Sequence, residues 1–194
     1  NPDVYLRSNL VGFCNLIELS KKFNIKHFIY ASTSSVYGEN KKKKFDEKDT
    51  IEKPLQFYAA TKSANELIAY SYSNIFKLKT TGLRFFTVYG PWGRPDMSLF
   101  KFVKNGLSDK AIDIYNNGNH LRDFTYIDDI VYYIEKIINQ KLNIKKNIPH
   151  EIFNIGGGSP IKLMDFVKII EKKLNKKLKK NYLSLQKGDI VKTS

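Results

Sequence analysis

Tyrosine and lysine side chains four residues apart form the pairs in this sequence that could perform acid–base chemistry. On a helix, such a pair lies on one face, about one turn apart. A nearby ammonium favours the phenolate and lowers the pKa of a phenol, so the tyrosine can act as a base near neutral pH. The chain has 12 Tyr and 33 Lys or Arg, a composition at which about two Tyr-x-x-x-Lys pairs arise by chance. Three occur: Tyr37/Lys41, Tyr58/Lys62 and Tyr132/Lys136.

The surroundings of Tyr58 and Lys62 distinguish this pair from the other two. Both residues lie in an Ala-containing segment without helix breakers, 56–76, which predicts a helix. An apolar run at 26–32 predicts a buried strand that leads into the hydroxyl run STSS, and open α/β sheets bind ligands at the carboxyl ends of their strands. Taken alone, STSS (32–35) is better explained as a polar turn. The other two pairs lie in a lysine-rich loop and on a surface-type helix without reactive neighbours.

Strand and helix patterns alternate along the chain, which predicts parallel βαβ units. The predicted fold class is α/β, with a boundary near residue 91. Residues 1–91 form the back half of a Rossmann-type doubly wound parallel sheet, and residues 92–194 form mainly a smaller α/β lobe. In the last predicted helix, Ser159 is the N-cap and Pro160 the first helical residue. Helices are predicted at 4–23, 56–76, 128–140 and 159–174, and strands at 26–32, within 79–90, at 111–118 and at 151–158.

The composition is that of an ordinary globular protein, with 42% hydrophobic and 27% charged residues. No run approaches the roughly 20 apolar residues that span a bilayer, so we expect no membrane association. A single cysteine, Cys14, fits a reducing, cytoplasmic location. The net charge of +14 raises a nucleic-acid-binding alternative. Nearly all of the excess is Lys in surface-type runs rather than Arg, so we expect solvated faces and no nucleic-acid partner. We also predict no metal site.

Six motifs follow one another along the chain and together resemble a known family. They are YASTSSVYG (30–38), YAATK (58–62), LRFFTVYGPWGRPDM (83–97), RDFTYIDDIV (122–131), FNIGGGSPIKLMDF (153–166) and QKGDIVKTS (186–194). In order and content they are similar to the extended short-chain dehydrogenase/reductase family, within it to the nucleotide-sugar epimerases, and most of all to the UDP-glucuronate 4-epimerases. The resemblance spans essentially the whole chain and marks Tyr58 and Lys62 as the catalytic pair.

The resemblance implies an NAD-dependent epimerisation at C4 of a UDP-sugar through a transient 4-keto intermediate. Tyr58 would take the proton from the 4-hydroxyl while a hydride passes from C4 to NAD+. Lys62 would hydrogen-bond the nicotinamide ribose, and Thr33 would orient the hydrogen bond to the 4-oxygen. Asn9 and Phe85 would lie beside the cofactor, with a solvated helix position as the equal alternative for Asn9.

Ser34 and Ser35 bear on the type of reaction. Related 4,6-dehydratases carry Asp and Glu after the Thr, and related UDP-glucuronate decarboxylases carry a Glu just before V-Y-G. Serine cannot serve as a general acid near neutral pH, so the resemblance favours simple epimerisation. Hydroxyl donors around the sugar C5 substituent would suit a carboxylate, which favours conversion of UDP-glucuronate to UDP-galacturonate. UDP-glucose and UDP-N-acetylglucosamine are the alternative substrates.

The other substrate contacts are carried over by motif position. Arg122 would bind the diphosphate, with a salt bridge to a nearby Asp as its alternative. Tyr115 would pack on the uracil unless it is a core residue, and Arg94 would lie near the sugar unless it is an ordinary loop arginine. The predicted substrate-binding residues are Thr33, Ser34, Ser35, Thr87, Arg94, Tyr115, Arg122, Gln186 and Asp189.

The glycine-rich NAD fingerprint of the family does not occur in this sequence, which opens at Asn1 in a helical pattern. We therefore expect a chain whose N-terminal part is missing and which is inactive by itself. Helices 4–23 and 56–76 correspond to the dimer interface of the family, so a homodimer is expected. A non-catalytic nucleotide-sugar-binding subunit is the remaining alternative.

Overall fold

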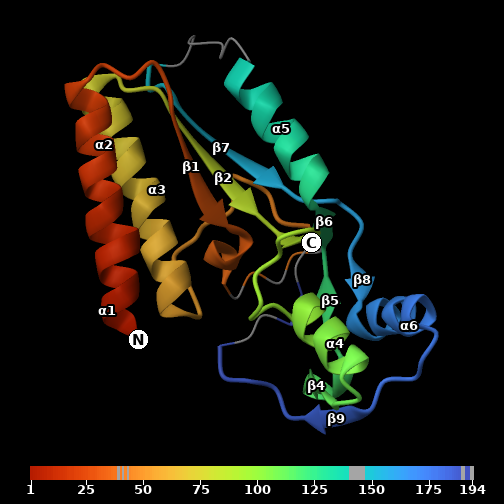
Figure 1. Cartoon of the computed structure of the whole chain (residues 1–194). Helices are drawn as coiled ribbons and strands as arrows, with labels where there is room; N and C mark the ends of the chain where they lie inside the picture. Colours follow the sequence, from red (N-terminus) through yellow and green to blue (C-terminus); the bar gives the residue numbers. More distant parts are fainter. Residues whose placement is uncertain (39, 41, 43, 140–146, 189–190, 193–194) are drawn as a thin grey trace. The chain divides into compact units, whose positions relative to one another are not determined.

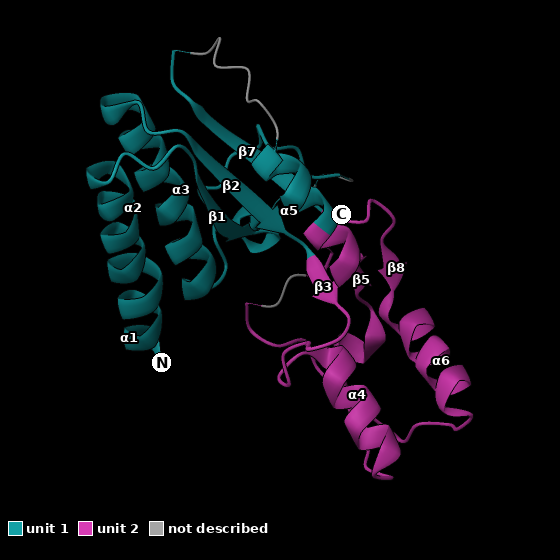
Figure 2. Cartoon of the chain, turned by 45° about the horizontal axis from the view of Figure 1, so that its top comes forward, with its two compact units in different colours: residues 1–86, 132–155 teal, residues 87–131, 156–194 magenta. Residues whose placement is uncertain are grey.

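The computed structural model describes residues 1–38, 40, 42, 44–139, 147–188 and 191–192. The chain packs into two compact units (Figure 2), residues 1–86 with 132–155 and residues 87–131 with 156–194. The predicted single boundary near residue 91 did not anticipate this alternation, which arises because a strand at 150–155 joins the sheet of the first unit. The assignment of cofactor and sugar binding to residues 1–91 and 92–194 stays a prediction.

The first unit begins with one continuous run of helix. It comprises α1 (Pro2–Tyr5), a π-helical segment (Leu6–Val11) and α2 (Gly12–Lys22), which confirms the helix predicted at 4–23. The π-helical segment was not predicted, because one inserted backbone position leaves little trace in an apolar pattern. The second predicted helix is also confirmed, as α3 (Phe57–Phe76).

A parallel sheet of three strands, in the order β1-β2-β7, lies beside these helices (Figure 1). Its strands are β1 (Phe28–Thr33), β2 (Thr80–Phe85) and β7 (His150–Ile155). Apolar side chains join sheet and helices, since Tyr30 of β1 packs in one cluster with Phe13 of α2 and Ala69 of α3. The register ends all three strands at one level, which places the STSS run at the carboxyl edge of the sheet, as predicted.

A tight turn follows β1 and leads into the loop before α3. It is a single 3-10 turn (Ser34–Tyr37), and Gly38 ends it with a φ of 54°. A Cβ at Gly38 would lie 1.8 Å from the Lys53 carbonyl oxygen, so only glycine fits this close approach between the two ends of the loop.

The second unit contains, among its described residues, three pairs of short strands and two helices. Two pairs are parallel, β3 (Thr87–Tyr89) with β6 (Phe124–Tyr126) and β4 (Ile112–Tyr115) with β9 (Lys180–Leu183). The third pair, β5 (Leu121–Arg122) with β8 (Ile161–Lys162), is antiparallel. The two helices are α4 (Ser98–Leu107) and α6 (Leu163–Leu174). Their core is formed by Phe102, Ile112, Ile114, Leu163, Phe166, Val167, Ile170 and Leu178. The helix α5 (Ile127–Asn139) contains the boundary at 131/132. No helix within the described ranges is both long and apolar enough to cross a membrane.

The start of α6 corrects the prediction made from the sequence. Ser159 was predicted as the N-cap, whereas the helix begins at Leu163 with Lys162 at the N-cap position. The residues in between form β8, and the Leu163 backbone N–H donates to the carbonyl oxygen of His120 at 2.9 Å. Pairing with β5 uses backbone groups that a helix starting at Pro160 would need. A capping pattern in the local sequence does not show that residues 161–162 pair with a distant strand instead of starting the helix.

His27 gives the first unit a pH-dependent stability. Its Nε2 lies 2.8 Å from the Thr81 hydroxyl, and burial together with the charge of Lys79 lowers the pKa of His27 to about 4. The unfolded chain takes up this proton near pH 6.5, so the free energy of unfolding should fall as the pH drops from about 6.5 to about 4. Urea unfolding at about pH 7.5 and about pH 5 should therefore show a smaller loss in His27→Gln than in the wild type. An equal loss in both proteins would contradict this pKa.

Candidate active site

Lys62 lies on α3 at the level of the carboxyl end of β1. Its Nζ donates a hydrogen bond of 3.1 Å to the carbonyl oxygen of Ala31, two residues before the strand ends. Burial lowers the pKa of this ammonium, because desolvation disfavours the charged form. Tyr58 is partly buried and lies one helical turn earlier on the same face. The predicted acid–base pair is therefore held at the end of β1.

Thr33 is the last residue of β1, and its side chain organises the turn that follows. Its Oγ1 accepts a hydrogen bond from the Ser35 backbone N–H at 3.2 Å and lies 3.3 Å from the Ser35 hydroxyl. Thr33 and Ser34 are buried, while Ser35 is partly exposed. Phe85 on β2 is the register partner of Thr33 and is also partly exposed. The edge of the sheet thus presents a cluster of hydroxyl groups beside an aromatic ring.

Asn9 is held against α3 by side-chain contacts. Its Nδ2 donates to the Thr61 hydroxyl at 3.0 Å, and that hydroxyl donates to the Tyr58 carbonyl oxygen at 2.7 Å. The ring of Tyr5 lies 5.7 Å from the ring of Tyr58. The first helical run therefore braces the turn of α3 that carries Tyr58. A contact between Asn9 and a cofactor stays a prediction.

The other two Tyr-x-x-x-Lys pairs have structural explanations. Tyr37 is buried, and its hydroxyl donates to Asn154 Oδ1 at 2.7 Å; Lys41 lies outside the described residues. Lys136 lies over the ring of the exposed Tyr132, at 5.2 Å from its centroid, a cation–π contact on a helix surface. Lys62, by contrast, is bonded to the backbone at the end of β1, one turn of α3 after Tyr58.

A pocket of about 260 Å³ in the second unit brings together three of the predicted substrate residues, Tyr115, Arg122 and Gln186. Tyr115 ends β4 and Arg122 lies in β5, and both are partly exposed, so neither is a plain core residue. Lys101 and the buried His120 line the same pocket. Two carboxylates, Asp96 and Asp113, line it as well, so the pocket combines an aromatic ring with side chains of both charge signs.

The remaining predicted substrate residues lie elsewhere. Arg94 is exposed and pairs through two hydrogen bonds with Asp96, Nε–Oδ1 at 3.0 Å and Nη2–Oδ2 at 2.5 Å. Thr87 begins β3, and its backbone N–H donates to the Asp123 carbonyl oxygen at 3.1 Å. Neither Arg94 nor Thr87 lines the pocket that contains Arg122. Asp189 lies outside the described residues.

Sequence reasoning missed the side chain that holds the GGG turn. The buried carboxylate of Asp123 accepts hydrogen bonds from the backbone N–H groups of Gly157 and Gly158, each at 2.9 Å. Burial raises the pKa of Asp123, and these two hydrogen bonds oppose the rise. Asp123 follows Arg122 directly, so this anchoring restrains the strand that carries Arg122. An acidic residue beside a predicted phosphate-binding arginine was the available signal.

Sequence reasoning also missed a buried ion pair between α3 and β2. Arg84 binds Glu66 through two hydrogen bonds, Nε–Oε1 at 3.0 Å and Nη2–Oε2 at 2.7 Å. Both side chains are about 95% buried. The sequence offered one signal only, that Glu66 lies four residues after Lys62 and so on the same face of the predicted helix.

The chain matches the sequence model of the NAD dependent epimerase/dehydratase family over residues 1–156. It is 52% identical to Protein CapI of Staphylococcus aureus over 100% of this chain and 61% of that protein. It is 45% identical to the probable UDP-glucuronate 4-epimerase of Rhizobium meliloti, over 100% of this chain and 60% of the relative. Among solved structures, the UDP-glucuronic acid 4-epimerase of Bacillus cereus, in complex with UDP-glucuronic acid and NAD, superposes with a TM-score of 0.89. That match has 36% identity and covers 97% of this chain and 58% of the Bacillus chain. The chain thus spans about three fifths of the length of these proteins.

Proposed function

The chain belongs to the NAD-dependent epimerase/dehydratase family, and from this premise we propose that the protein to which it belongs epimerises C4 of a UDP-sugar, with UDP-glucuronate as the substrate and UDP-galacturonate as the product. The hydrogen bond from Lys62 to Ala31 carries the proposal. It fixes the face of α3 that bears Tyr58 at the strand end where Thr33 lies. Acid–base catalysis requires that kind of placement.

Each of the three residues has one task in the proposed reaction. Tyr58, as phenolate, removes the proton from the sugar 4-hydroxyl and later returns it to the 4-oxygen. Lys62 stabilises the phenolate by its charge, and its partial desolvation strengthens that interaction. Thr33 orients the 4-oxygen through its hydroxyl, which the turn at Ser35 keeps in a fixed position.

The residues at this edge fit the nicotinamide ribose in their chemistry. Lys62 carries three N–H donors, of which one is directed to Ala31. Tyr58 adds a hydroxyl group one turn earlier on the helix. Asn9 and Phe85 would complete the cofactor contacts of this part of the chain. When NAD is bound, it supplies the hydride acceptor and donor for C4.

The sugar is assigned from the hydroxyl cluster and from the relatives. Ser34 and Ser35 provide hydroxyl groups where related dehydratases and decarboxylases carry acids, so an oxidised sugar meets no carboxyl group at these two positions. Hydroxyl donors also suit the carboxylate of a glucuronate. A relative 45% identical and a structure 36% identical are both named as acting on UDP-glucuronate, which supports the same assignment. UDP-glucose and UDP-N-acetylglucosamine stay the alternative substrates.

The nucleotide end of the substrate is assigned to the pocket of the second unit. Arg122 would bind the diphosphate with charge-assisted hydrogen bonds. Tyr115 would pack on the uracil, and Gln186 would hydrogen-bond the nucleoside. Their shared lining of one pocket supports this assignment.

The test of the proposed function is a conversion assay on the complete protein that the gene encodes. Purified protein is incubated with UDP-glucuronate, UDP-glucose or UDP-N-acetylglucosamine, and the C4 epimers are separated by chromatography. Formation of UDP-galacturonate from UDP-glucuronate alone supports the proposal in full. Conversion of a different sugar keeps the reaction class and overturns the assignment from Ser34 and Ser35. No conversion of any of the three favours a non-catalytic nucleotide-sugar-binding protein.

We further propose that the protein forms a homodimer through its first helical run and α3. Both carry exposed apolar side chains at helical spacing, Leu16 and Leu19 on α2, with Phe23 directly after its end, and Leu67, Tyr70 and Ile75 on α3. A second copy would cover these stripes and remove their apolar surface from water.

Charges placed in these stripes should disrupt the dimer. Leu16→Glu combined with Leu67→Glu is expected to shift the sedimentation of the complete protein from dimer to monomer, because two carboxylates would be buried at the interface without partners. Leu107→Glu is the matched control, since Leu107 is 69% exposed, like Leu67 at 66%, but lies on α4. A monomeric wild type, or a double variant that stays dimeric, would remove the proposal.

A further inference from the structure

Three polar side chains form one rung across the sheet of the first unit. Ser32, Arg84 and Asn154 are register partners on β1, β2 and β7. In a parallel sheet such partners point to the same face. Ser32 and Arg84 are both buried and both contact Glu66 of α3. The rung therefore connects the sheet directly to the helix that carries Tyr58 and Lys62.

Glu66 continues the face of α3 that bears the catalytic pair. Tyr58, Lys62 and Glu66 follow at intervals of four residues, on successive turns. Lys62 is bonded to Ala31, and Glu66 accepts a hydrogen bond from the hydroxyl of Ser32, the next residue of β1. Two consecutive turns of the helix are thus attached to two consecutive residues of the strand, immediately before Thr33.

We propose, on the basis of the proposed function, that Glu66 is a positioning residue for the reaction. Its ion pair with Arg84 and its hydrogen bond with Ser32 fix the register of α3 against β1, and through it the placement of Tyr58 and Lys62 beside Thr33. Burial lowers the pKa of Lys62, and Arg84 neutralises the charge of Glu66. Glu66 therefore acts through position rather than through its own electric field.

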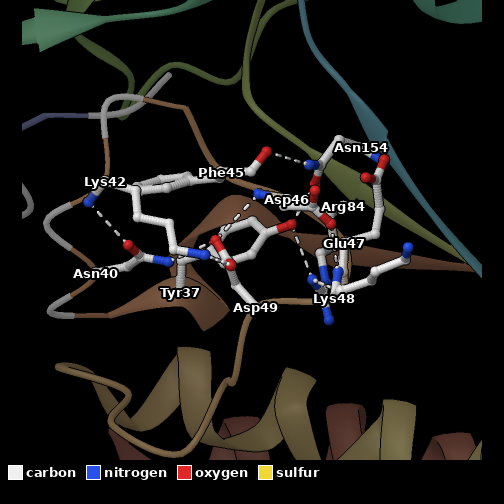
Figure 3. A network of polar contacts seen from close by, with 10 residues as sticks. All are labelled: Tyr37, Asn40, Lys42, Phe45, Asp46, Glu47, Lys48, Asp49, Arg84 and Asn154. Carbon is white, nitrogen blue, oxygen red and sulfur yellow. Dashed lines mark hydrogen bonds and ion pairs between the residues drawn. The ribbon is translucent and has the colours of Figure 1, made fainter.

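Arg84 has a fixed position in the first unit, because its guanidinium is bonded to other residues besides Glu66. Figure 3 shows its guanidinium beside Tyr37, Glu47 and Asn154. Its Nη1 donates to the Tyr37 hydroxyl at 2.8 Å and to the Glu47 carbonyl oxygen at 3.3 Å. Glu47 in turn accepts the Asn154 backbone N–H at 2.8 Å. The turn after β1 and the loop before α3 therefore both bond this side chain, and Asn154 of β7 bonds the same two residues, Tyr37 and Glu47.

The energetics of a buried ion pair indicate that it fixes the alignment of α3 with the sheet more than it adds to the stability of the fold. Burying two charges costs desolvation that their attraction only partly offsets, so apolar side chains of similar volume often stabilise a fold equally well. A bidentate Arg–carboxylate pair, however, accepts only one relative placement of its two elements. A shift of about 1 Å in an acid–base group can slow a reaction about 100-fold.

The experiment compares variants of the complete protein in the epimerase assay. Glu66→Gln keeps the shape of the side chain but removes its charge and replaces one of the two acceptor oxygens with an NH2 group, which then faces a donor of Arg84. We expect kcat to fall about 10-fold to 100-fold with KM for the UDP-sugar changed less than about twofold, and the acid limb of the kcat–pH profile to move to higher pH. Ser73→Ala is the matched control, because Ser73 is equally buried on α3 and bonded to Thr80 of β2, but lies eleven residues beyond Lys62. It should lower the thermal midpoint and leave kcat unchanged.

Two further measurements keep the proposal testable if an arm fails. Should Glu66→Gln not fold, Ser32→Ala removes only one of the contacts of Glu66 and should lower kcat several-fold without changing KM. If the wild type converts no UDP-sugar, the proposed function fails, but the positioning of Tyr58 can still be tested. The test is the absorbance of the Tyr58 phenolate, obtained by subtracting the spectrum of Tyr58→Phe. We expect that phenolate to appear at higher pH in Glu66→Gln than in the wild type. The inference is overturned if folded Glu66→Gln keeps the wild-type kcat, or if Ser73→Ala loses as much kcat as Glu66→Gln. It is also overturned if the phenolate titrates at the same pH in Glu66→Gln and in the wild type.

Discussion

Tyr58→Phe should abolish epimerisation in the complete protein while the fold and the affinity for UDP are kept. The substitution removes the only atom of the side chain that can accept the 4-hydroxyl proton, and general acid–base catalysis contributes about 10²-fold to 10⁴-fold. Because the same oxygen both takes the proton and returns it, we expect a loss of about 10³-fold or more in kcat. Product formation measured by chromatography gives kcat, and calorimetric titration with UDP gives the affinity.

Tyr132→Phe is the matched control for that substitution. Tyr132 has a lysine four residues later, as Tyr58 has, but it is 54% exposed on α5 and its partner Lys136 lies over its ring. The phenylalanine keeps the ring, so activity should stay within about twofold of the wild type. If Tyr58→Phe retained a tenth of the wild-type rate, or if Tyr132→Phe lost as much as Tyr58→Phe, the role assigned to Tyr58 would be wrong.

The sequence predicted the elements that pack by local pattern. The helices at 2–22 and 57–76 and the strand at 28–33 were predicted within two residues of their ends, because each has a local signal. Apolar residues recur at helical spacing in the first helix, the second contains no breaker, and the strand is a short apolar run. The chemistry at the end of β1 was also predictable, since hydroxyl residues after a buried strand and a Tyr-x-x-x-Lys pair on the next helix need no knowledge of tertiary contacts.

The parts that were not predicted depend on contacts between distant residues. The short strands β5 and β8 contain two residues each, too few to show a period, and their pairing displaced the predicted N-cap at Ser159. The return of β7 to the first unit depends on its pairing with β2, about 70 residues away in the chain. The partner of Arg84 was equally hidden, because Glu66 reads as an ordinary surface residue of a helix until the sheet is in place.

Removing the guanidinium of Arg84 should strongly destabilise the first unit. The Arg84 and Glu66 side chains are 4% and 5% exposed, so Arg84→Met leaves a buried carboxylate without its ionic partner. Such a loss costs about 3–5 kcal/mol in the free energy of unfolding. Burial by itself opposes the charge on Arg84, but the hydrogen bonds and charge of Glu66 outweigh it and raise the pKa of Arg84 above its usual value. Urea unfolding of the complete protein, followed by circular dichroism, measures the cost.

The double variant Arg84→Met/Glu66→Leu separates the stability of the ion pair from its effect on placement. With both charges gone, no buried carboxylate is left unpaired, so most of the loss seen in Arg84→Met should be recovered, apart from the hydrogen bonds of Ser32 and Tyr37. Two apolar side chains do not fix one register as a bidentate pair does, so kcat should stay low even where stability returns. A double variant as unstable as Arg84→Met would show that the cavity and the remaining polar groups dominate the cost. A double variant with wild-type kcat would show that packing alone places Tyr58 and Lys62.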